Sequence, residues 1–344
     1  MQTPPPPGAP EHSFVSPGLA LRQSDGGWIA GAEGAAYALH AASASAIPVL
    51  IAVPHAGRCY PADVLARLRR PEMAALRLED RLVDRIGEAV AAQTGASLLV
   101  ARAARAVIDL NRAEDDIDWD MLGTGAPRNG QLPGLTPALP GAAMMGNGRA
   151  RAGLGLVPRR VPGLGELWQG RLSPEELATR INGIHRPYHA ALSAALEDIR
   201  VRWGAALLID LHSMPPLPAP VGQGGGAAEL VLGDRFGASC SGALIATAFA
   251  RVAACGRRAA HNRPYAGGYV LDRHAAPRRG IHAFQVEICR ATYLDSRLVD
   301  LGAGFDSVAG MVAGIVRSLA EEVAVIGARA TGGSLSQGWA DAAE

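Results

Sequence analysis

Side chains that can do chemistry follow four short apolar segments of this chain. They are His55 after 47–54, Asn111 and Arg112 after 105–108, His212 after 205–209, and Glu287 after 282–286. Short apolar segments bounded by turn signals are typical of buried strands in a parallel sheet. Because ligands bind beyond the carboxyl ends of such strands, we expect these side chains to gather at one edge of the sheet. The set suits a metal-bound water that attacks a carbonyl in a substrate bearing a carboxylate.

The two histidines are the candidate metal ligands. His55 follows Pro54 at a strand end, before a turn of small residues, and His212 ends the strand predicted over 205–211. Since strand side chains alternate, Asp210 and His212 share a side, where the carboxylate can orient the imidazole and leave its other nitrogen for a metal. Equivalent positions on two strands favour a shared ion over the alternative, in which each histidine is an ordinary hydrogen-bonded residue.

A catalytic zinc site usually has three protein ligands and keeps one position for water, so a third ligand is required. A carboxylate is the best choice, and the candidates are Glu79, Asp80 and Asp84, in the first half of a helix predicted over 71–95. We choose Asp80. The alternative is that these acidic residues only complement the dipole near the start of the helix.

Glu287 is the candidate general base. It interrupts an apolar strand, and burying a carboxylate is costly unless the group is paired or functional. As a base, it would take a proton from metal-bound water and pass it to the leaving amine. The alternative is a structural salt bridge from Glu287 to Arg290 or Arg273.

Two arginines and a glycine-containing turn supply candidates for contact with the substrate. Arg105 can polarise the scissile carbonyl, and Arg112 is of the residue type that binds carboxylates with two parallel hydrogen bonds. In the segment 262–269, which contains Tyr265 and Gly267, glycines permit the backbone to approach a ligand closely. The alternatives are solvated arginines, in a chain rich in arginine, and a tight loop before a strand.

The composition indicates a soluble α/β protein without a nucleic-acid or membrane partner. The chain has 344 residues, of which 49% are hydrophobic and 19% charged, and its formal net charge is +1. The sequence shows no polybasic segment, no N-terminal signal and no apolar stretch long enough to span a bilayer. The four cysteines form no paired motif, so we expect a reducing, cytoplasmic environment. The expected partner is a small-molecule substrate that carries carboxylates.

The pattern along the chain predicts an α/β fold with a mixed, mostly parallel central sheet flanked by helices, in a single hydrolytic domain over 17–330. We expect the Pro-rich arm 1–16 to be disordered and 331–344 to form a flexible tail. The Gly- and Pro-rich stretch 122–170 has little periodicity, and we interpret it as a loop that folds over the site as a lid.

The elements themselves follow from apolar periodicity and from start and stop signals. Strands are predicted over 47–53, 97–101, 105–110, 205–211, 229–232 and 282–288, with an edge hairpin or a short strand near 28–30 and 36–41. Helices are predicted over 71–95, 173–203, 242–255 and 298–326. The second helix begins with a capping box of Ser173 and Glu176 and is expected to kink at Pro187.

Six motifs, in order along residues 47–295, resemble those of the N-formylglutamate amidohydrolases. They are Pro54-His55-Ala-Gly57 with Pro61, Asp109-Leu-Asn111-Arg112-Ala-Glu-Asp-Asp, Asp210-Leu-His212-Ser-Met-Pro215, Leu232-Gly-Asp234-Arg-Phe-Gly237, Pro264-Tyr-Ala-Gly-Gly268 and Gln285-Val-Glu287-Ile. Each motif alone is weak, but six in the family's order are specific.

The resemblance implies a zinc-exopeptidase-like fold, similar in plan to the metallocarboxypeptidases, and a divalent metal, with zinc as the first choice. It implies hydrolysis of N-formyl-L-glutamate to formate and L-glutamate, at the end of histidine degradation. It also implies site roles: His55 and His212 as metal ligands, Glu287 as the base, Arg105 on the carbonyl, and Asn111 with Arg112 on the substrate carboxylate.

One position departs from the wider carboxypeptidase pattern. That pattern often has its acidic ligand three residues after the first histidine, where this chain has Arg58, so the acidic ligand must come from elsewhere. Two other functions stay open at this point. One is an amide hydrolase of the same architecture that acts on another N-acyl amino acid, and the other is a non-catalytic binding protein that keeps the pocket.

Overall fold

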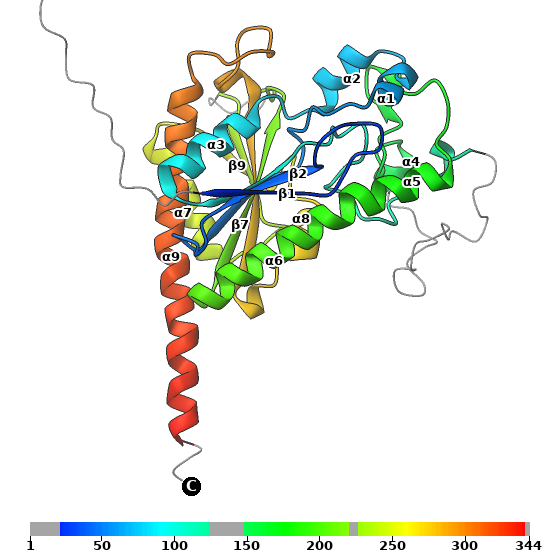
Figure 1. The fold of residues 1–344 in the computed structure, drawn as a ribbon. Coiled ribbons are helices and arrows are strands. Elements are labelled where there is room, and N and C mark those ends of the chain that lie inside the picture. The colour runs from blue at the N-terminus through cyan, green and yellow to red at the C-terminus, as the bar shows by residue number, and fades with distance from the viewer. Residues whose placement is uncertain (1–20, 124–147, 220–225, 341–344) are drawn as a thin grey trace, which may run out of the picture.

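The computed structural model describes residues 21–123, 148–219 and 226–340, with side chains described as far as residue 330. Eight strands of this described part form one mixed sheet, in the order β1-β2-β4-β3-β7-β10-β8-β9 (Figure 1). Strands β4, β3, β7 and β10 are parallel neighbours, whereas β1, β2 and β8 contribute the antiparallel pairs. The predicted class, a mixed and mostly parallel sheet flanked by helices, is confirmed.

The bounds of the elements are as follows. The sheet strands are β1 (Arg22–Gly26), β2 (Tyr37–Ala41), β3 (Val49–Val53), β4 (Ser97–Ala101), β7 (Ala206–Met214), β8 (Leu230–Gly233), β9 (Ala259–His261) and β10 (Ile281–Cys289), and a separate hairpin joins β5 (Arg160–Val161) to β6 (Gly165–Glu166). The α-helices are α1 (Ala62–Arg67), α2 (Pro71–Leu78), α3 (Val83–Thr94), α4 (Gly148–Arg151), α5 (Pro174–Arg180), α6 (Arg186–Trp203), α7 (Gly242–Ala254), α8 (Tyr269–His274) and α9 (Phe305–Ala340). A π-helical turn, Ile181–His185, joins α5 to α6, and short 3₁₀ turns lie at Trp119–Met121, Pro277–Arg279 and Arg290–Thr292.

The central strands are apolar because helices cover both faces of the sheet (Figure 1). On β3, Val49 and Ile51 pack into the core shared with α3, α7 and α9, and Leu50 and Ala52 pack into the core shared with α6. The same alternation on β7 and β10 sends even positions of β7 and odd positions of β10 toward the α6 side. This face of the sheet carries the polar residues of the site.

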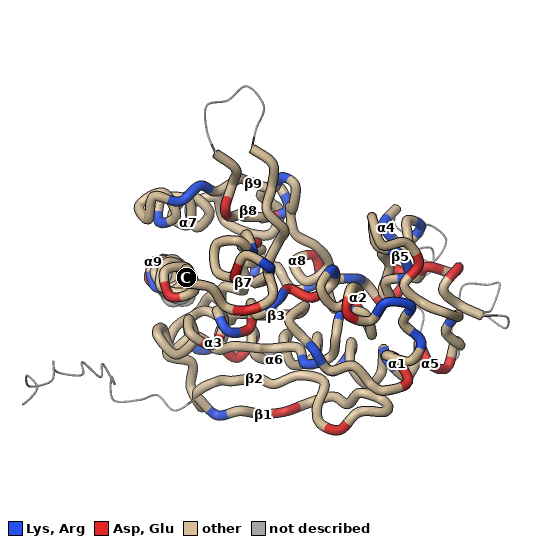
Figure 2. The backbone as a smooth tube through the Cα atoms, turned by 90° about the horizontal axis from the view of Figure 1, so that it is seen from above, with Lys and Arg blue, Asp and Glu red and all other residues tan. Residues whose placement is uncertain are grey.

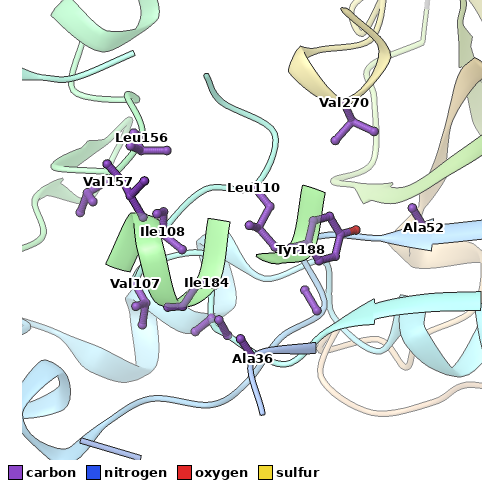
Figure 3. Close-up of a cluster of buried hydrophobic side chains, with 14 of the residues drawn as sticks. Ala36, Ala52, Val107, Ile108, Leu110, Leu156, Val157, Ile184, Tyr188 and Val270 are labelled. Atoms are coloured by element: carbon purple, nitrogen blue, oxygen red, sulfur yellow. The ribbon is translucent and has the colours of Figure 1, made fainter. Parts of the chain in front are cut away.

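The predicted strand over 105–110 is wrong. Its backbone forms a turn instead of pairing with the sheet, because the Val107 amide bonds to the Ala104 carbonyl and the Asp109 amide to the Leu156 carbonyl. The side chains of Val107 and its apolar neighbours are nonetheless buried in the α6-side core (Figure 3). A short apolar run therefore marked burial here, and burial alone does not separate a strand from an irregular segment.

The predicted helix over 71–95 is two helices. Helix α2 ends at Leu78, Leu82 adopts a left-handed φ of 54°, and α3 begins at Val83. Glu79 and Asp80 therefore lie in the break between the helices and not in the first half of one helix. The predicted stop at Gly95 is confirmed, with φ of 75° at that residue.

Three other boundaries differ from the prediction. The edge hairpin pairs β1 with β2, so that 28–30 is not one of its strands. The capping box of Ser173 and Glu176 is present. The helix predicted over 173–203 is interrupted by the π-helical turn Ile181–His185, which ends two residues before Pro187. The last helix begins at Phe305 because the chain turns before it, with a left-handed φ of 58° at Leu298.

The stretch 122–170 is only partly described. Residues 148–170 contain α4 and the β5–β6 hairpin, and they bury Leu156, Leu167 and Trp168 in the core, so this part is packed and not structureless. Residues 124–147 of this stretch lie outside the described residues, as do the arm 1–16 and residues 341–344, and the lid over 122–170 stays a prediction. The positions 331–340, expected in a flexible tail, continue α9.

Strands from residues 22 to 289 join the one sheet. In the described part of the chain, no helix combines the length and the apolar character needed to cross a membrane.

Candidate metal and catalytic site

Strands β7 and β10 place two pairs of polar residues side by side. In the parallel register, His212 lies opposite Glu287 and Asp210 lies opposite Gln285. All four are buried and occupy the α6 side of the sheet near its carboxyl ends. Viewed from above, acidic and basic residues lie close together around β3 and β7 (Figure 2).

His55, Asp80 and His212 come together at this edge. One potential ligand atom from each lies within 4.8 Å of the others, and all three residues are buried. The Nδ1 atoms of both histidines face the same Asp80 oxygen, at 2.8 Å from His212 and 3.7 Å from His55. Two imidazole nitrogens and one carboxylate oxygen are a donor set suited to a divalent transition metal.

The outer nitrogens of the two histidines are each held by an aspartate. The Nε2 atom of His55 lies 2.7 Å from Asp109, and that of His212 lies 2.9 Å from Asp210. Histidines that bind metals almost always hydrogen-bond a carboxylate, carbonyl or water with the second nitrogen, which fixes the ring and its tautomer. The residues present therefore fit a metal, with both Nδ1 atoms turned inward.

Asp80 reaches the histidines because contacts from two directions fix it. Its amide bonds to the carbonyl of His55 at 3.0 Å. Arg290, which follows β10, donates to the Glu79 carbonyl and lies 3.4 Å from the second oxygen of Asp80. Burial alone would raise the pKa of Asp80, but the hydrogen bond and charge of His212 hold that pKa below its ordinary value.

The other two acidic candidates have partners elsewhere. The carboxylate of Glu79 accepts hydrogen bonds from Tyr60, at 2.8 Å, and from Arg81, at 3.2 Å. Asp84 is bound through both oxygens by Arg58, at 3.0 and 2.5 Å. The arginine that replaces the wider pattern's acidic ligand thus neutralises Asp84.

The two histidines differ in charge. Burial and the nearby Arg105 lower the pKa of His55, so its neutral imidazole is favoured. Burial also acts against protonation of His212, but Asp210 and Asp80 raise its pKa well above the ordinary value. Without a cation, a proton on His212 offsets these carboxylates, and a bound cation would take over that role.

Glu287 lies beside His212 in a site that disfavours its charge. Burial raises its pKa to about 7, with His212 and Arg105 opposing the shift. Gln285 donates a hydrogen bond of 2.8 Å to one carboxylate oxygen. Within the described part of the chain neither expected salt bridge to Glu287 forms, because Arg290 binds Ser213 and the α2 end, and Arg273 donates to Tyr269.

Arg105 lies among the carboxylates of the site. It donates from Nε to Asp109 at 2.9 Å, and Asp109, Asp80 and Glu287 together raise its pKa against the opposing effect of burial. Asp109 therefore joins His55 to Arg105. The sequence reasoning gave Asp109 no role, because its histidine partner is 54 residues away, whereas Asp210 and His212 are two residues apart.

Asn111, Arg112 and Gly267 line part of the wall of a cavity of about 470 Å³. The amide of Asn111 donates to Asp109 at 2.8 Å, which connects this wall to the histidine site. Arg112 is buried and donates to the carbonyls of Leu154 and Asn111. Tyr265 does not line this cavity; it packs near Met214, and burial together with the charges of Glu287 and Asp80 raises its pKa.

The glycine turn brings backbone close to protein side chains, and its approach to a ligand stays a prediction. A Cβ at Gly268 would lie 2.6 Å from the Asn111 side-chain oxygen, and a Cβ at Gly267, where φ is 100°, would lie 3.3 Å from Arg235. The Val270 amide donates to the same Asn111 oxygen at 3.0 Å. The turn thus fixes the position of Asn111.

Two buried histidines outside the metal site support the same segment. His189 bonds through Nε2 to the Leu110 carbonyl at 3.0 Å, and His185 bonds through Nε2 to the Arg112 carbonyl at 2.8 Å. Burial, with the charges of neighbouring histidines, lowers the pKa of His189 well below its ordinary value, so this residue is neutral. Sequence reasoning missed this pair, although their spacing of four on a helix was a usable signal.

The fold and the site together define an α/β protein with a candidate hydrolytic metal centre. Comparison with known proteins gives a more specific assignment, to a family of amide hydrolases. Residues 47–294 match the model of the family described as N-formylglutamate amidohydrolase. The chain belongs to the N-formylglutamate amidohydrolase family, which confirms the resemblance seen in the sequence.

Relatives with this name cover most of the chain. It is 30% identical over 252 residues to an N-formylglutamate deformylase of Pseudomonas aeruginosa (73% of this chain, 84% of the relative) and 31% identical over 251 residues to one of Pseudomonas putida (72% and 82%). The crystal structure of an N-formylglutamate amidohydrolase from Ralstonia eutropha JMP134 is 31% identical and superposes with a TM-score of 0.71, over 83% of this chain and 98% of that one. A gene product of Agrobacterium tumefaciens, 16% identical over 84% of this chain and 96% of its own, shares the fold with a TM-score of 0.58.

Proposed function

We propose that this chain hydrolyses N-formyl-L-glutamate to formate and L-glutamate, with a divalent cation held by His55, Asp80 and His212. The observation that carries the proposal is the convergence of three buried ligand atoms within 4.8 Å beside Glu287. The names of the relatives support the substrate. Zinc is the first choice of metal, and the proposal includes the cytoplasmic step of histidine degradation that the sequence resemblance implies.

When bound, a divalent cation polarises a carbonyl oxygen and makes water nucleophilic near neutral pH. Glu287 supplies the proton transfer. Its carboxylate takes a proton from the water that attacks the formyl carbon and returns it to the nitrogen that leaves with glutamate. A pKa of about 7 suits both directions of transfer, because neither form is strongly favoured at neutral pH.

Arg105 and the cavity wall position the substrate in this proposal. The guanidinium of Arg105 stabilises the oxyanion that develops on the formyl oxygen. Asn111 and Arg112 bind the α-carboxylate of the substrate, and Tyr265 and Gly267 complete its contacts. The buried hydrogen bonds of this wall keep these groups in place before the substrate arrives.

The test is to strip the protein with a chelator, titrate zinc or cobalt back, and measure formate release from N-formyl-L-glutamate. We expect activity to vanish on stripping and to return at one equivalent of metal. Full activity in verified metal-free protein would overturn the metal role. A panel of N-formyl, N-acetyl and N-succinyl amino acids distinguishes another acyl specificity, and binding without turnover would identify a non-catalytic protein.

Asp210→Asn tests the support of the second histidine. Asparagine keeps the volume but removes the charge that orients His212, and loss of such a partner costs about 10- to 100-fold in metal affinity. We therefore expect the dissociation constant of the metal to be higher than in the wild type by that factor. The circular dichroism spectrum should not change. Equal affinity in competition with a fluorescent chelator would contradict the role of Asp210.

Gly268→Ala tests the position of Asn111. The new Cβ would lie 2.6 Å from Asn111, so the amide must move, and displacement of a positioning group costs up to about 100-fold in rate. We expect KM for N-formyl-L-glutamate to rise roughly tenfold or more. Gly170→Ala is the control, since no atom lies within 4 Å of a Cβ there. Equal KM values for the two variants would count against a role for Asn111 in binding.

A further inference from the structure

The cavity beside the metal site holds three guanidinium groups. Arg112, Arg149 and Arg235 all line it. Arg112 comes from the buried wall next to Asn111, whereas Arg235 follows β8, whose end packs against the glycine turn. The wall also carries Asp115, Asp116 and Asp272, so its charges are balanced. A single α-carboxylate needs one guanidinium, and a second anionic group on the same ligand needs another whose terminal nitrogens point away from these aspartates.

Arg235 has its terminal nitrogens available. Its Nε donates to Asp272 at 2.6 Å, and among the described residues its two terminal nitrogens donate no hydrogen bond. Asp272 therefore orients the guanidinium from its Nε edge and leaves the opposite edge with two parallel donors. That edge matches the two oxygens of a carboxylate.

The backbone that carries Arg235 is held in an unusual conformation. Arg235 and Phe236 have φ of 54° and 56°, a region that side-chain-bearing residues rarely adopt. Buried Asp234 fixes this turn by accepting hydrogen bonds from the Gly237 amide, at 3.1 Å, and from Asn262, at 2.7 Å. Such conformations persist where surrounding contacts impose them, and they are common at functional sites.

The glycine turn links the two ends of the cavity. Gly267 leaves room for Leu271, at 2.5 Å from a Cβ built there, and lies against the aliphatic part of Arg235, at 3.3 Å, while Gly268 leaves room for Asn111. The amide of Arg235 also bonds to the Ala266 carbonyl at 2.8 Å. One rigid turn thereby sets the separation between Arg235 and the Asn111–Arg112 pair, as recognition of a dicarboxylate of fixed length requires.

We propose that Arg235 binds the side-chain carboxylate of the N-formylated amino acid and thereby selects acidic amino acids. The inference rests on the proposed function, because it assigns the α-carboxylate to Asn111 and Arg112. It divides the substrate's two negative charges between two arginines on different elements.

The test compares N-formyl-L-glutamate with N-formyl-L-glutamine, which has the same shape but an uncharged side chain. In Arg235→Gln, we expect kcat/KM for the glutamate substrate to fall about 10- to 100-fold, mainly through KM, as loss of a charge-assisted hydrogen bond predicts. The value for the glutamine substrate should stay within about threefold, since that substrate brings no charge to the subsite. Arg278→Gln, at an exposed position before β10, is the control for loss of one positive charge.

Three results would overturn the proposal while formate release stands. The first is an equal fall in kcat/KM for both substrates in Arg235→Gln. The second is a wild type that has the same kcat/KM for N-formyl-L-glutamate and N-formyl-L-glutamine. The third is a preference for the glutamate substrate that Arg149→Gln loses and Arg235→Gln keeps. If the wild type releases formate from neither substrate, the proposed function fails, and calorimetry with L-glutamate and L-glutamine then decides the subsite. The subsite proposal is supported if the wild type binds L-glutamate more tightly than L-glutamine and Arg235→Gln does not. It is overturned if the wild type binds both amino acids equally or binds neither.

Discussion

His212→Ala should purify without its cation and release formate on the order of 1,000-fold more slowly than the wild type. The variant removes one of three ligands, and a catalytic metal contributes several kcal/mol of transition-state stabilisation. His212 also lies between Asp80 and Asp210, at 2.8 and 2.9 Å, and the group of possible ligands found here among the described residues has only His55 and Asp80 as its other members. Elemental analysis of the purified protein and a formate assay measure the two effects.

Removal of His212 also leaves two buried carboxylates without their shared partner, which lowers the free energy of unfolding. His212→Gln keeps a hydrogen-bond donor for these carboxylates and serves as the second variant. Glu79→Gln is the matched control, because Glu79 is buried next to Asp80 but binds Tyr60 and Arg81. A folded His212 variant with a full equivalent of cation would refute the ligand assignment, and so would cation loss in the Glu79 variant alone.

The site residues on β7 and β10 were predictable because each strand is contiguous, buried and alternating. The period of two placed Asp210 and His212 on one side, and the structure shows the carboxylate bound to the imidazole. Register between the strands was not visible in either segment alone. Only the structure sets Glu287 opposite His212, since pairing of distant strands depends on the whole sheet.

The choice among the acidic candidates could not come from local sequence. It depends on Arg58, which binds Asp84 from 26 residues away, and on Arg290, which reaches Asp80 from 210 residues away. Helical periodicity also continued across residues 79–82, where the chain leaves the helix. Periodicity records which side chains are buried, and it does not record where the backbone breaks.

The 105–110 segment and Arg235 are two further cases in which tertiary contacts set a backbone conformation that the local sequence does not predict. The first is apolar like a strand but is held by a turn and by hydrogen bonds to a distant loop. Arg235 belongs to the motif Leu232–Gly237 of the family resemblance, but its proposed role depends on a left-handed turn that Asp234 and Asn262 fix. Backbone conformations imposed by tertiary contacts leave little trace in composition or period.

Glu287→Gln should lower kcat by about 100- to 10,000-fold, the range for loss of a positioned general acid or base. Glutamine keeps the volume and can still accept the hydrogen bond from Gln285, so the fold, the cation content and KM should change little. The amide has no carboxylate to take the proton from water or to return it to the leaving nitrogen. Steady-state kinetics with matched elemental analysis separate this loss from metal loss.

The pH profile gives an independent readout of the same variant. In the wild type, activity falls as pH drops through the pKa of Glu287, because the protonated acid cannot accept a proton. Glu287→Gln should lose this acid limb, and Glu229→Gln, whose side chain pairs with Arg257 away from the site, should keep it. A Glu287 variant within about threefold of wild-type kcat would assign proton transfer to another group. Because Arg290 and Arg273 are bound elsewhere, a structural salt bridge then could not account for the buried carboxylate either.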